Sequence, residues 1–429
     1  MDPIFRWSLA TRLKFTHERG PPLIGPAKFP RLSVLLIAKF LPMKEAGPLQ
    51  QINRTYVRQR GRTLSYFGGC DYFRLASHPK ILQAVTRGLR VYGLNVAASR
   101  VTTGNHELYP TLERELARFF GAEAALLASS GYVTNLLVAQ ALAGQFSHAL
   151  VDERTHVALQ DAAQMLNCPV LTFQHRNPDN FAAALQRCGR AARPIVLTDG
   201  MFSRDGSVAP LRAYLRLLPR DGLLMVDDAH GAGTLGKNGK GSVEVEKIPR
   251  DRVVQNITLS KAFGVYGGAI LCSRQLREKL AASRMFVGST PLPLPLAFAA
   301  RQSLQILRQD KSLQRRLEAN GGFVKSALRQ AGFTLSESPG PIVPLHFNDA
   351  KDIVRLKRAL LAAGILPPLI NYHGGPPHGY FRFIISSEHR QPQLRTLVRT
   401  LTPFAPAKKD RTTSQVTASG CDRISRCRC

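Results

Sequence analysis

Short runs of apolar residues recur through the middle of the chain, and each ends in polar residues. Five of these runs are predicted to be strands, at 124–128, 194–197, 223–226, 253–259 and 268–272. Runs that are apolar at every position are typical of parallel strands covered on both faces. Stretches with helical spacing accompany them, at 108–120, 134–143, 156–166, 180–188 and 211–218. This alternation predicts an α/β protein whose large domain holds a mostly parallel sheet.

The pattern changes after Pro295. One long helical pattern runs to about Ala331, and a smaller α+β unit follows, with strands at 342–347 and 380–386 and helices at 351–363 and 391–402. Nearer the start, 48–60 is predicted as a polar helix and 63–67 as a short strand. The predicted division is therefore an N-terminal extension (1–42), a lead-in segment (43–90), a large domain (91–292), a smaller C-terminal domain (293–404) and a disordered basic tail (405–429).

Two interpretations of residues 1–42 remain. The segment is basic and poor in acids, as organelle-targeting segments are. Alternatively the natural start is Met43 and the fold does not need the upstream part. Prolines at positions 21, 22, 26 and 30 would break a presequence helix, which favours the second interpretation. In the tail, Cys421, Cys427 and Cys429 have no further ligands nearby, so a loose tail is favoured and no metal site is predicted.

The chain carries 59 basic and 29 acidic residues, a net charge of +30. Such an excess first suggests a nucleic-acid partner. The basic residues are spread along the chain, however, and substrates that carry phosphates and carboxylates explain them as well, so a nucleic-acid role is not favoured. No apolar run reaches 18 residues, which argues against a membrane-spanning helix. Seven cysteines do not make a disulfide scaffold in a chain of this size, so we expect a cytoplasmic protein.

Unusual polar residues stand just beyond the predicted strands. In an open α/β sheet, ligands bind outside the carboxyl ends of the strands. The residues at these ends are Ser130, Gly131, Tyr132, Ser203, Asp227, His230, Thr258 and Lys261. The first three also open a helix, whose free N–H groups can bind an anion.

Asp227 and Lys261 are the most informative of these residues. A buried acid is costly unless it faces a cation, although most such aspartates cap a helix or form a salt bridge. A desolvated lysine becomes a nucleophilic amine suited to a Schiff base, although most lysines are solvated. Pyridoxal 5′-phosphate requires a lysine for its aldehyde, a carboxylate for its ring nitrogen and N–H donors for its phosphate. The sequence therefore predicts this cofactor.

A glycine-rich segment at 231–236 matches the dinucleotide motif G-x-G-x-x-G and nearly matches a P-loop. Asn238 stands where a P-loop requires Ser or Thr. Both motifs also need the glycines to open a helix, and residues 237–242 are too rich in glycine for one. A nucleotide site is therefore not favoured.

The sequence Asp-Asp-Ala-His-Gly-Ala-Gly-Thr-Leu-Gly at 227–236, followed by Thr-Leu-Ser-Lys-Ala-Phe-Gly at 258–264, resembles the α-oxoamine synthases. These are pyridoxal-phosphate enzymes of the fold-type I aminotransferase superfamily. Further segments agree in order, at 70–75, 99–104, 152–156, 198–206 and 286–290. The resemblance covers about 48–402 and is greatest to the 8-amino-7-oxononanoate synthase branch, which serves biotin biosynthesis. It implies an aminotransferase-like fold and a homodimer with the site near the shared interface.

The resemblance also implies a role for each residue. Lys261, Asp227 and His230 are the implied catalytic residues: Lys261 binds the aldehyde and then takes the α-proton, Asp227 keeps the ring nitrogen protonated, and His230 bonds the ring hydroxyl. The other implied cofactor contacts are from Ser203 to that hydroxyl, from His156 to the ring face, and from Ser130, Gly131, Tyr132 and Thr258 to the phosphate. Without the resemblance, His156 would be interpreted as a capping or core histidine.

Arg382 matches the arginine that binds the substrate carboxylate in the family, and its bidentate fork suits that task. The alternative is that it pairs with a structural acid such as Glu388. The implied reaction condenses an amino acid, most simply alanine, with an acyl thioester of coenzyme A or acyl carrier protein and releases carbon dioxide. Alternatives are a related synthase, such as a glycine C-acyltransferase, or a basic binding protein without turnover.

The sequence departs from the family pattern at three places. Cys70 replaces an asparagine, Leu366 and Leu369 flank two prolines where the family has Arg-Pro-Pro-Thr, and 95–98 replaces a glycine-rich stretch. These changes concern substrate contacts more than cofactor contacts. They favour a longer acyl chain over acetyl.

Overall fold

The computed structural model describes residues 47–371 and 376–406. The chain divides into two units, Met1–Ala46 and Gly47–Cys429, and the described residues belong to the second. The predictions for residues 1–42, for most of the tail and for its three cysteines lie outside the described residues. Within the described part, no helix has the length and apolar character needed to cross a membrane.

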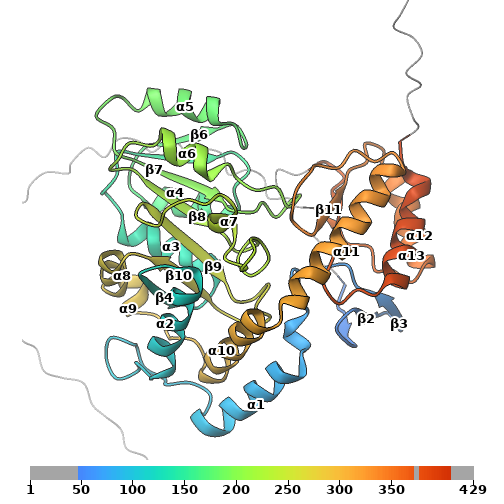
Figure 1. The fold of residues 1–429 in the computed structure, drawn as a ribbon, viewed down its shortest axis with the longest axis horizontal. Helices are drawn as coiled ribbons and strands as arrows, with labels where there is room; N and C mark the ends of the chain where they lie inside the picture. Colours follow the sequence, from blue (N-terminus) through green and yellow to red (C-terminus); the bar gives the residue numbers. More distant parts are fainter. Residues whose placement is uncertain (1–46, 372–375, 407–429) are drawn as a thin grey trace, which may run out of the picture. The chain divides into compact units, whose positions relative to one another are not determined.

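A seven-stranded sheet with the strand order β4-β10-β9-β8-β7-β5-β6 forms the centre of the larger part (Figure 1). Its strands are β4 (Ala124–Ala128), β5 (His148–Asp152), β6 (Val170–Phe173), β7 (Pro194–Asp199), β8 (Leu223–Asp227), β9 (Val253–Thr258) and β10 (Gly268–Cys272). Strands β5 to β9 pair in parallel, and β10 is antiparallel to β4 and β9. Strand β4 therefore points the same way as the parallel strands, and all their carboxyl ends share one edge.

Helices cover both faces of this sheet, as the continuous apolar runs predict. Helices α3, α4 and α8 pack on one face. On the other face, α2 and α10 cover the end near β4, and α5 and α6 cover the end near β6. The bounds are α2 Leu108–Phe120, α3 Gly131–Ala141, α4 Val157–Met165, α5 Pro178–Arg187, α6 Leu211–Leu217, α8 Arg274–Ala281 and α10 Leu294–Gln309, and shorter or flanking helices are η1 Leu75–Ser77, α1 Pro79–Tyr92, α7 Ser242–Val245 and α9 Arg284–Val287.

The C-terminal part is an α+β unit with its own hydrophobic core. Its sheet has the order β11-β13-β12 and is antiparallel. Helices α11, α12 and α13 pack against the sheet through leucine, isoleucine and valine side chains. The bounds are β11 Ile342–Leu345, β12 Leu369–Ile370, β13 Tyr380–Ile384, α11 Lys311–Gln330, α12 Ala350–Ala362, α13 Gln391–Leu401 and η2 Thr402–Phe404.

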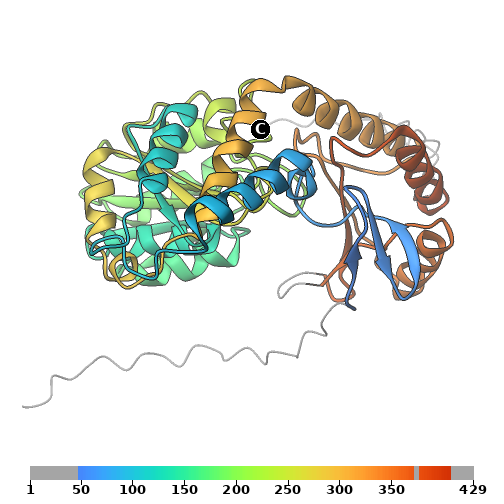
Figure 2. The ribbon, with the colours of Figure 1, turned by 90° about the horizontal axis from the view of Figure 1, so that it is seen from below.

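Strands from the start of the described chain join this C-terminal unit (Figure 2). Their bounds are β1 Gln50–Gln51, β2 Tyr56–Gln59 and β3 Arg62–Ser65. The Ser65 amide donates to the Gly364 carbonyl at 2.7 Å, and the Ile384 amide donates to the Phe67 carbonyl at 2.7 Å. The main chain leading to Cys70 and Tyr72 is thereby held by the C-terminal unit.

The structure confirms the predicted fold class and corrects several elements. The predicted helix at 48–60 is wrong: Arg60 and Gly61, with φ of 48° and 74°, form the two-residue turn of a β-hairpin. Side chains alternate between the two faces of this hairpin, and Val57 lies on the buried face. The predicted helix from 295 to 331 is two helices, because Asp310 leaves the helical conformation and accepts a hydrogen bond from the Ser312 amide at the start of α11. Strands β5 and β6 and helix α1 were not predicted.

Candidate active site

The predicted cofactor residues follow strand ends along one edge of the sheet. Ser130 follows β4, Lys261 follows β9, His230 follows β8, Ser203 follows β7 and His156 follows β5. Because these strands point the same way, residues up to 131 positions apart in the sequence meet at one edge. The structure therefore brings together what the sequence analysis placed at separate strand ends.

The amine of Lys261 lies among charged groups in this cluster. Its pKa is lowered, because the surrounding protein removes water from the amine, and nearby Cys70, Asp227 and Asp199 oppose the shift. A lysine with a lowered pKa has more of the neutral, nucleophilic form than a solvated lysine has. Cys70, where the sequence departs from the family pattern, is therefore close enough to affect the charge of the lysine that the sequence analysis singled out.

The buried carboxylate of Asp227 receives a hydrogen bond on each oxygen. The amide of Asn135 donates to Oδ2 at 2.6 Å, and the Ala229 N–H donates to Oδ1 at 3.0 Å. Asn256 in turn donates to Oδ1 of Asn135 at 2.8 Å, which fixes the orientation of that amide. Sequence reasoning missed Asn135 and Asn256. The available signal was a fully buried polar residue within an apolar helix and one within an apolar strand.

The first turn of α3 is open to an anion. Ser130 caps the helix by accepting from the Val133 N–H at 3.3 Å, while the N–H groups of Gly131 and Tyr132 point out of the helix end. A Cβ at Gly131 would lie 2.7 Å from Cβ of Thr258, so only glycine lets the helix start this close to the end of β9. The phenol of Tyr132 donates to Asp161 and is exposed, so this residue offers its backbone to the site.

His230 is buried and bonded to a tyrosine that the sequence analysis did not select. Oη of Tyr72 lies 2.7 Å from Nδ1 of His230. Burial lowers the pKa of His230 well below its ordinary value, and the Lys261 charge lowers it further. Burial raises the pKa of Tyr72 well above 10. With both groups neutral, Nδ1 of the imidazole can accept a hydrogen bond from the phenol, and the ring proton is then carried on Nε2.

His156 caps a helix, which is the role expected for it without the family resemblance. Its Nδ1 accepts from the Ala158 N–H at 3.2 Å at the start of α4, and its own N–H donates to Asp199 at 3.2 Å. Removal of water around the ring lowers the pKa of His156, although the residue has an exposed edge. Burial raises the pKa of Asp199 well above its ordinary value, and the Asp227 charge adds to the effect. Contact of His156 with a cofactor ring stays a prediction.

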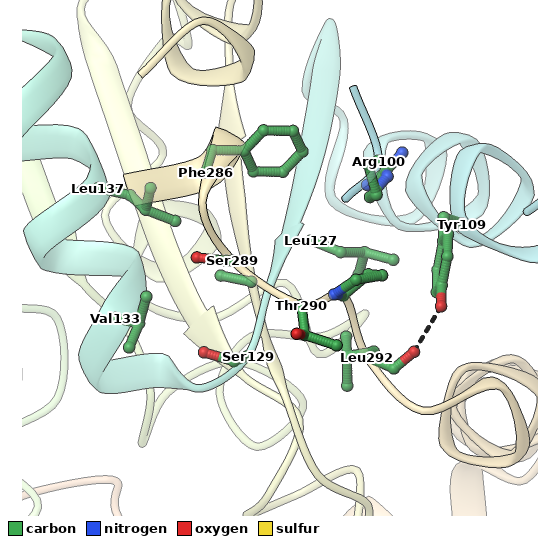
Figure 3. Close-up of a pocket in the computed structure, with 12 residues that line it drawn as sticks. Arg100, Tyr109, Leu127, Ser129, Val133, Leu137, Phe286, Ser289, Thr290 and Leu292 are labelled. Carbon is green, nitrogen blue, oxygen red and sulfur yellow. Dashed lines mark hydrogen bonds between the residues drawn. The ribbon is translucent and has the colours of Figure 1, made fainter. Parts of the chain in front are cut away.

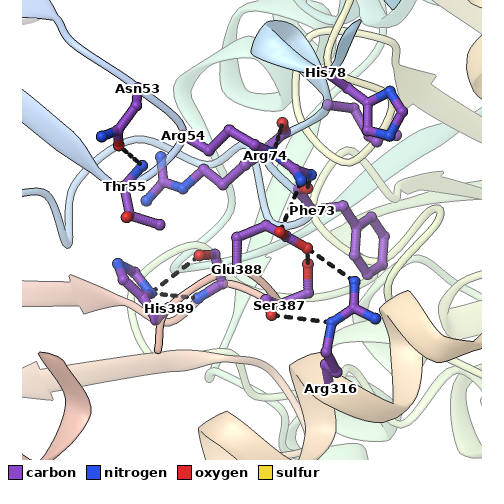
Figure 4. Close-up of polar contacts among 12 residues, drawn as sticks. Asn53, Arg54, Thr55, Phe73, Arg74, His78, Arg316, Ser387, Glu388 and His389 are labelled. Carbon is purple, nitrogen blue, oxygen red and sulfur yellow. Dashed lines mark hydrogen bonds and ion pairs between the residues drawn. The ribbon is translucent and has the colours of Figure 1, made fainter. Parts of the chain in front are cut away.

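Arg382 lies on β13 and reaches across to the larger part of the protein. Its Nη1 donates to the Ser203 carbonyl at 3.1 Å. Glu388, the alternative partner, instead pairs with Arg54 at 2.7 Å and with Arg316 at 2.9 Å (Figure 4). Glu388 is therefore engaged by two other arginines, and Arg382 lies beside Ser203, a predicted cofactor residue. Leu369, one of the departures from the family pattern, pairs with Phe381 next to Arg382.

The glycine-rich segment after β8 encloses a buried acid. Oδ2 of Asp228 accepts from the Ser242 N–H at 2.8 Å and from the Gln255 amide at 2.6 Å. A Cβ at Gly231 would lie 2.1 Å from Oδ1, and one at Gly241 would lie 2.0 Å from Oδ2. The glycines therefore allow the loop to close around Asp228. This packing explains the glycine-rich motif without nucleotide binding.

A small pocket lies behind the N-terminus of α3 and brings two motif segments together (Figure 3). Arg100 lines it from the segment 99–104, and Phe286, Ser289 and Thr290 line it from the segment 286–290. Arg100 pairs with both oxygens of Glu113. Lys261 and Asp227 do not line this pocket, so it is separate from the cluster described above. In the described ranges, no group of three acids, histidines or cysteines could hold a metal.

The comparisons with known proteins agree with this geometry. The family model described as aminotransferase class I and II matches residues 71–401. An 8-amino-7-oxononanoate synthase from Thioalkalivibrio sulfidiphilus is 35% identical over 345 residues, which cover 80% of this chain and 88% of that protein. One from Geobacter sulfurreducens is 35% identical over 319 residues, which cover 72% of this chain and 82% of that protein.

Solved structures share the fold. A serine palmitoyltransferase from Sphingomonas wittichii has a TM-score of 0.78 and 24% identity, and covers 83% of this chain and 92% of that one. An 8-amino-7-oxononanoate synthase from Francisella tularensis has a TM-score of 0.70 and 24% identity. The match covers 80% of this chain and 97% of that one. The predicted fold, family resemblance and pyridoxal-phosphate cofactor are confirmed. The chain belongs to the aminotransferase class I and II family, and within it to the α-oxoamine synthases.

Proposed function

We propose that this protein is a pyridoxal-phosphate-dependent acyltransferase that condenses an amino acid with an acyl thioester and releases carbon dioxide and the free thiol. The observation that carries the proposal is the meeting of Lys261, Asp227 and the open end of α3 at neighbouring strand ends. The relatives that are 35% identical and named 8-amino-7-oxononanoate synthase support it.

The residues present fit the cofactor. Gly131 lets the first turn of α3 pack against Thr258, because a Cβ there would lie 2.7 Å from Cβ of that residue, and the free N–H groups of this turn are the donors that a phosphate would need. Asp227 is buried and held by amide donors, so its carboxylate would face the ring nitrogen. Lys261 has a lowered pKa and would bind the aldehyde carbon.

When bound, the cofactor withdraws electrons from the substrate's α-carbon. Each protein group then has a defined task. Asp227 would hold the ring nitrogen in its protonated form, and Nε2–H of His230, together with Ser203, would form hydrogen bonds to the ring hydroxyl. Lys261 takes the α-proton of the bound amino acid at Nζ, which its lowered pKa favours. His156, neutral because its pKa is lowered, would lie against the ring face.

Substrate choice follows from the residues around Arg382. Its guanidinium would bind the amino-acid carboxylate, and alanine is the first candidate. Leu366 and Leu369 replace polar residues of the family pattern, and Leu369 pairs with Phe381 next to Arg382, which favours a longer acyl chain over acetyl. The carrier is coenzyme A or acyl carrier protein, and a related synthase with another amino acid, such as a glycine C-acyltransferase, is the alternative.

A homodimer is part of this proposal. Side chains of α1 and the following loop expose apolar surface in the single chain, with Leu89 at 50% and Leu94 at 62% exposure. Burial of such surface against a second copy would stabilise the pair. Sedimentation at several concentrations tests this, and an active monomer at every dilution would contradict it. The cytoplasmic location expected from the sequence stays a prediction.

The decisive experiment has three steps on one preparation. The purified protein is loaded with pyridoxal phosphate, reduced with borohydride and digested, and mass spectrometry should place the cofactor on Lys261. Amino acids are then screened for a change in the absorbance of the loaded protein, and acyl thioesters for release of free thiol. Lys261→Ala should fold but carry no covalent cofactor. A wild-type protein that binds no cofactor would overturn the proposal.

A further inference from the structure

A lysine in the C-terminal unit is buried without a carboxylate bonded to its amine. Lys325 of α11 is only 6% exposed. Its Nζ donates to the Ser338 carbonyl at 2.8 Å, to Oγ of Ser338 at 3.0 Å and to the Gly340 carbonyl at 2.5 Å. An ammonium group has three protons, so each of them has an acceptor. All three bonds hold one short segment, 338–340, against the helix.

That segment in turn holds the turn that carries Ser203. Oγ of Ser338 donates to the Asp205 carbonyl at 2.9 Å. Gly340 packs directly on Gly206: a Cβ at Gly340 would lie 2.7 Å from Cα of Gly206, and Gly206 itself has φ of 76°. Neither position accepts a side chain. The segment 338–340 and the turn 203–206 therefore fit together as two backbones in contact.

Both the turn and the segment connect to Arg382. The Ser203 carbonyl of the turn accepts from Nη1 of Arg382 at 3.1 Å. The segment 338–340 leads into β11, where Pro344 pairs with Arg382 in the sheet. A displacement of 338–340 would therefore move both the Ser203 carbonyl that accepts from Arg382 and the strand β11 beside Arg382.

We propose that Lys325 is a positioning residue for substrate binding: by tying segment 338–340 to α11, it holds the 203–206 turn where the Ser203 carbonyl orients Arg382 for the carboxylate of the amino acid. This inference rests on the proposed function, in which Arg382 binds that carboxylate. Lys325 does not touch the substrate and acts only through these intervening groups.

The charge state of Lys325 gives this arrangement a dependence on pH. Its pKa is lowered to about 8, mainly by burial and also by the Arg329 charge, while the charge of Asp205 opposes both. Arg329 lies one turn further along α11, and Asp205 lies in the turn that packs against the segment. Loss of a proton removes one of three donors, so the attachment weakens as the pH rises through about 8. Amino-acid affinity should weaken in the same range.

The test compares amino-acid binding by cofactor-loaded wild type and Lys325→Met, followed by absorbance from pH 6.5 to 9.5. At pH 7 the variant should bind alanine about tenfold more weakly, and any loss of affinity for pyridoxal phosphate should be smaller, because Ser203 is only one of several proposed cofactor contacts. The advantage of the wild type should shrink as the pH rises through about 8. Lys311→Met, the same change at the start of the same helix, is the matched control and should behave as wild type does.

Two further variants keep the outcome decisive if Lys325→Met folds poorly. Ser338→Ala removes the link to Asp205 and one of the three acceptors of Lys325, and it should weaken alanine binding about threefold. Arg329→Gln removes a charge that lowers the pKa of Lys325, so it should move the alkaline transition to higher pH. Equal alanine affinity in wild type, Lys325→Met and Ser338→Ala would overturn the inference while leaving the proposed function intact. A wild type that binds cofactor but no amino acid would instead overturn the proposed function.

Discussion

The side-chain amide of Asn135 donates a 2.6 Å hydrogen bond to the carboxylate of Asp227, and it does so from α3, the helix whose first turn is open to a phosphate. One helix therefore positions both the acid proposed for the ring nitrogen and the N–H groups proposed for the phosphate. Both contacts would be made to the same cofactor. Their spacing is fixed by a rigid helix, which reduces the reorganisation needed when the cofactor binds.

We predict that Asn135→Ala weakens binding of pyridoxal phosphate at least tenfold. A hydrogen bond to a charged group is worth about 1.5–3 kcal/mol, and about 1.4 kcal/mol corresponds to a tenfold change. The measurement is a titration of the cofactor into the cofactor-free protein, followed by absorbance. Asn320→Ala is the control, because Asn320 is also buried but donates to the Ser386 and His389 carbonyls in the C-terminal unit. It should lower the melting temperature and leave cofactor affinity unchanged.

Gly131→Ala should also weaken cofactor binding, by a different route. The new Cβ would lie 2.7 Å from Cβ of Thr258, so the first turn of α3 must move away from β9 and carry its N–H groups with it. Gly322→Ala is the matched control, since a Cβ at that position in α11 meets nothing within 4 Å. Alanine should stabilise that helix by about 0.5–1 kcal/mol. If both variants bind the cofactor as wild type does, the end of α3 is not the phosphate site.

Tyr72→Phe tests whether the phenol fixes the tautomer of His230. Removal of Oη leaves Nδ1 of His230 without the donor that lies 2.7 Å away, so the ring proton is no longer confined to Nε2. Cofactor affinity should fall several-fold. Tyr109→Phe removes a comparable buried hydrogen bond, of 2.6 Å to the Leu292 carbonyl, outside the cluster. It should cost stability alone, and similar cofactor losses in both variants would contradict the assignment.

The sequence was sufficient to find residues whose chemistry is unusual for their position. Asp227 and Lys261 were predictable because a charged residue at the end of an apolar run is expensive to bury, and that signal is local. Asp227 ends β8 and Lys261 follows β9, and these two strands are neighbours in the sheet, so the two residues lie near each other in the fold. Arg382 required the family resemblance, since nothing in its own strand distinguishes it from a surface arginine.

The residues that support the site could not be found in this way. Tyr72 lies 158 positions from His230, and Asn135 lies 92 positions from Asp227, so each pair forms only when the sheet is complete. Glu388 is similar: its pairing with Arg54 and Arg316 depends on three distant segments (Figure 4). The hairpin at Arg60 was missed for a local reason, because a non-glycine residue with positive φ carries no clear signal in the sequence.

The last prediction concerns acid stability and His389. This residue is 3% exposed, stacks on Phe67 with ring centroids 4.2 Å apart, and accepts from the Ser386 N–H at 2.9 Å. Burial lowers its pKa to about 3, and the Arg74 charge acts in the same direction. The unfolded chain, with an ordinary histidine pKa near 6.5, therefore binds more protons than the folded protein between these values. The stabilising contribution is complete above about pH 6.5 and is lost as the pH falls toward 3. At pH 5 the loss amounts to about 2 kcal/mol of the free energy of unfolding.

Urea denaturation of wild type and His389→Gln at pH 7.5 and pH 5 tests this. The difference between their free energies of unfolding should be smaller at pH 5 by that amount. Asp228, whose pKa burial raises to about 6, shifts both proteins equally and cancels in the comparison. A gap that is the same at both pH values would show that His389 does not titrate differently on folding.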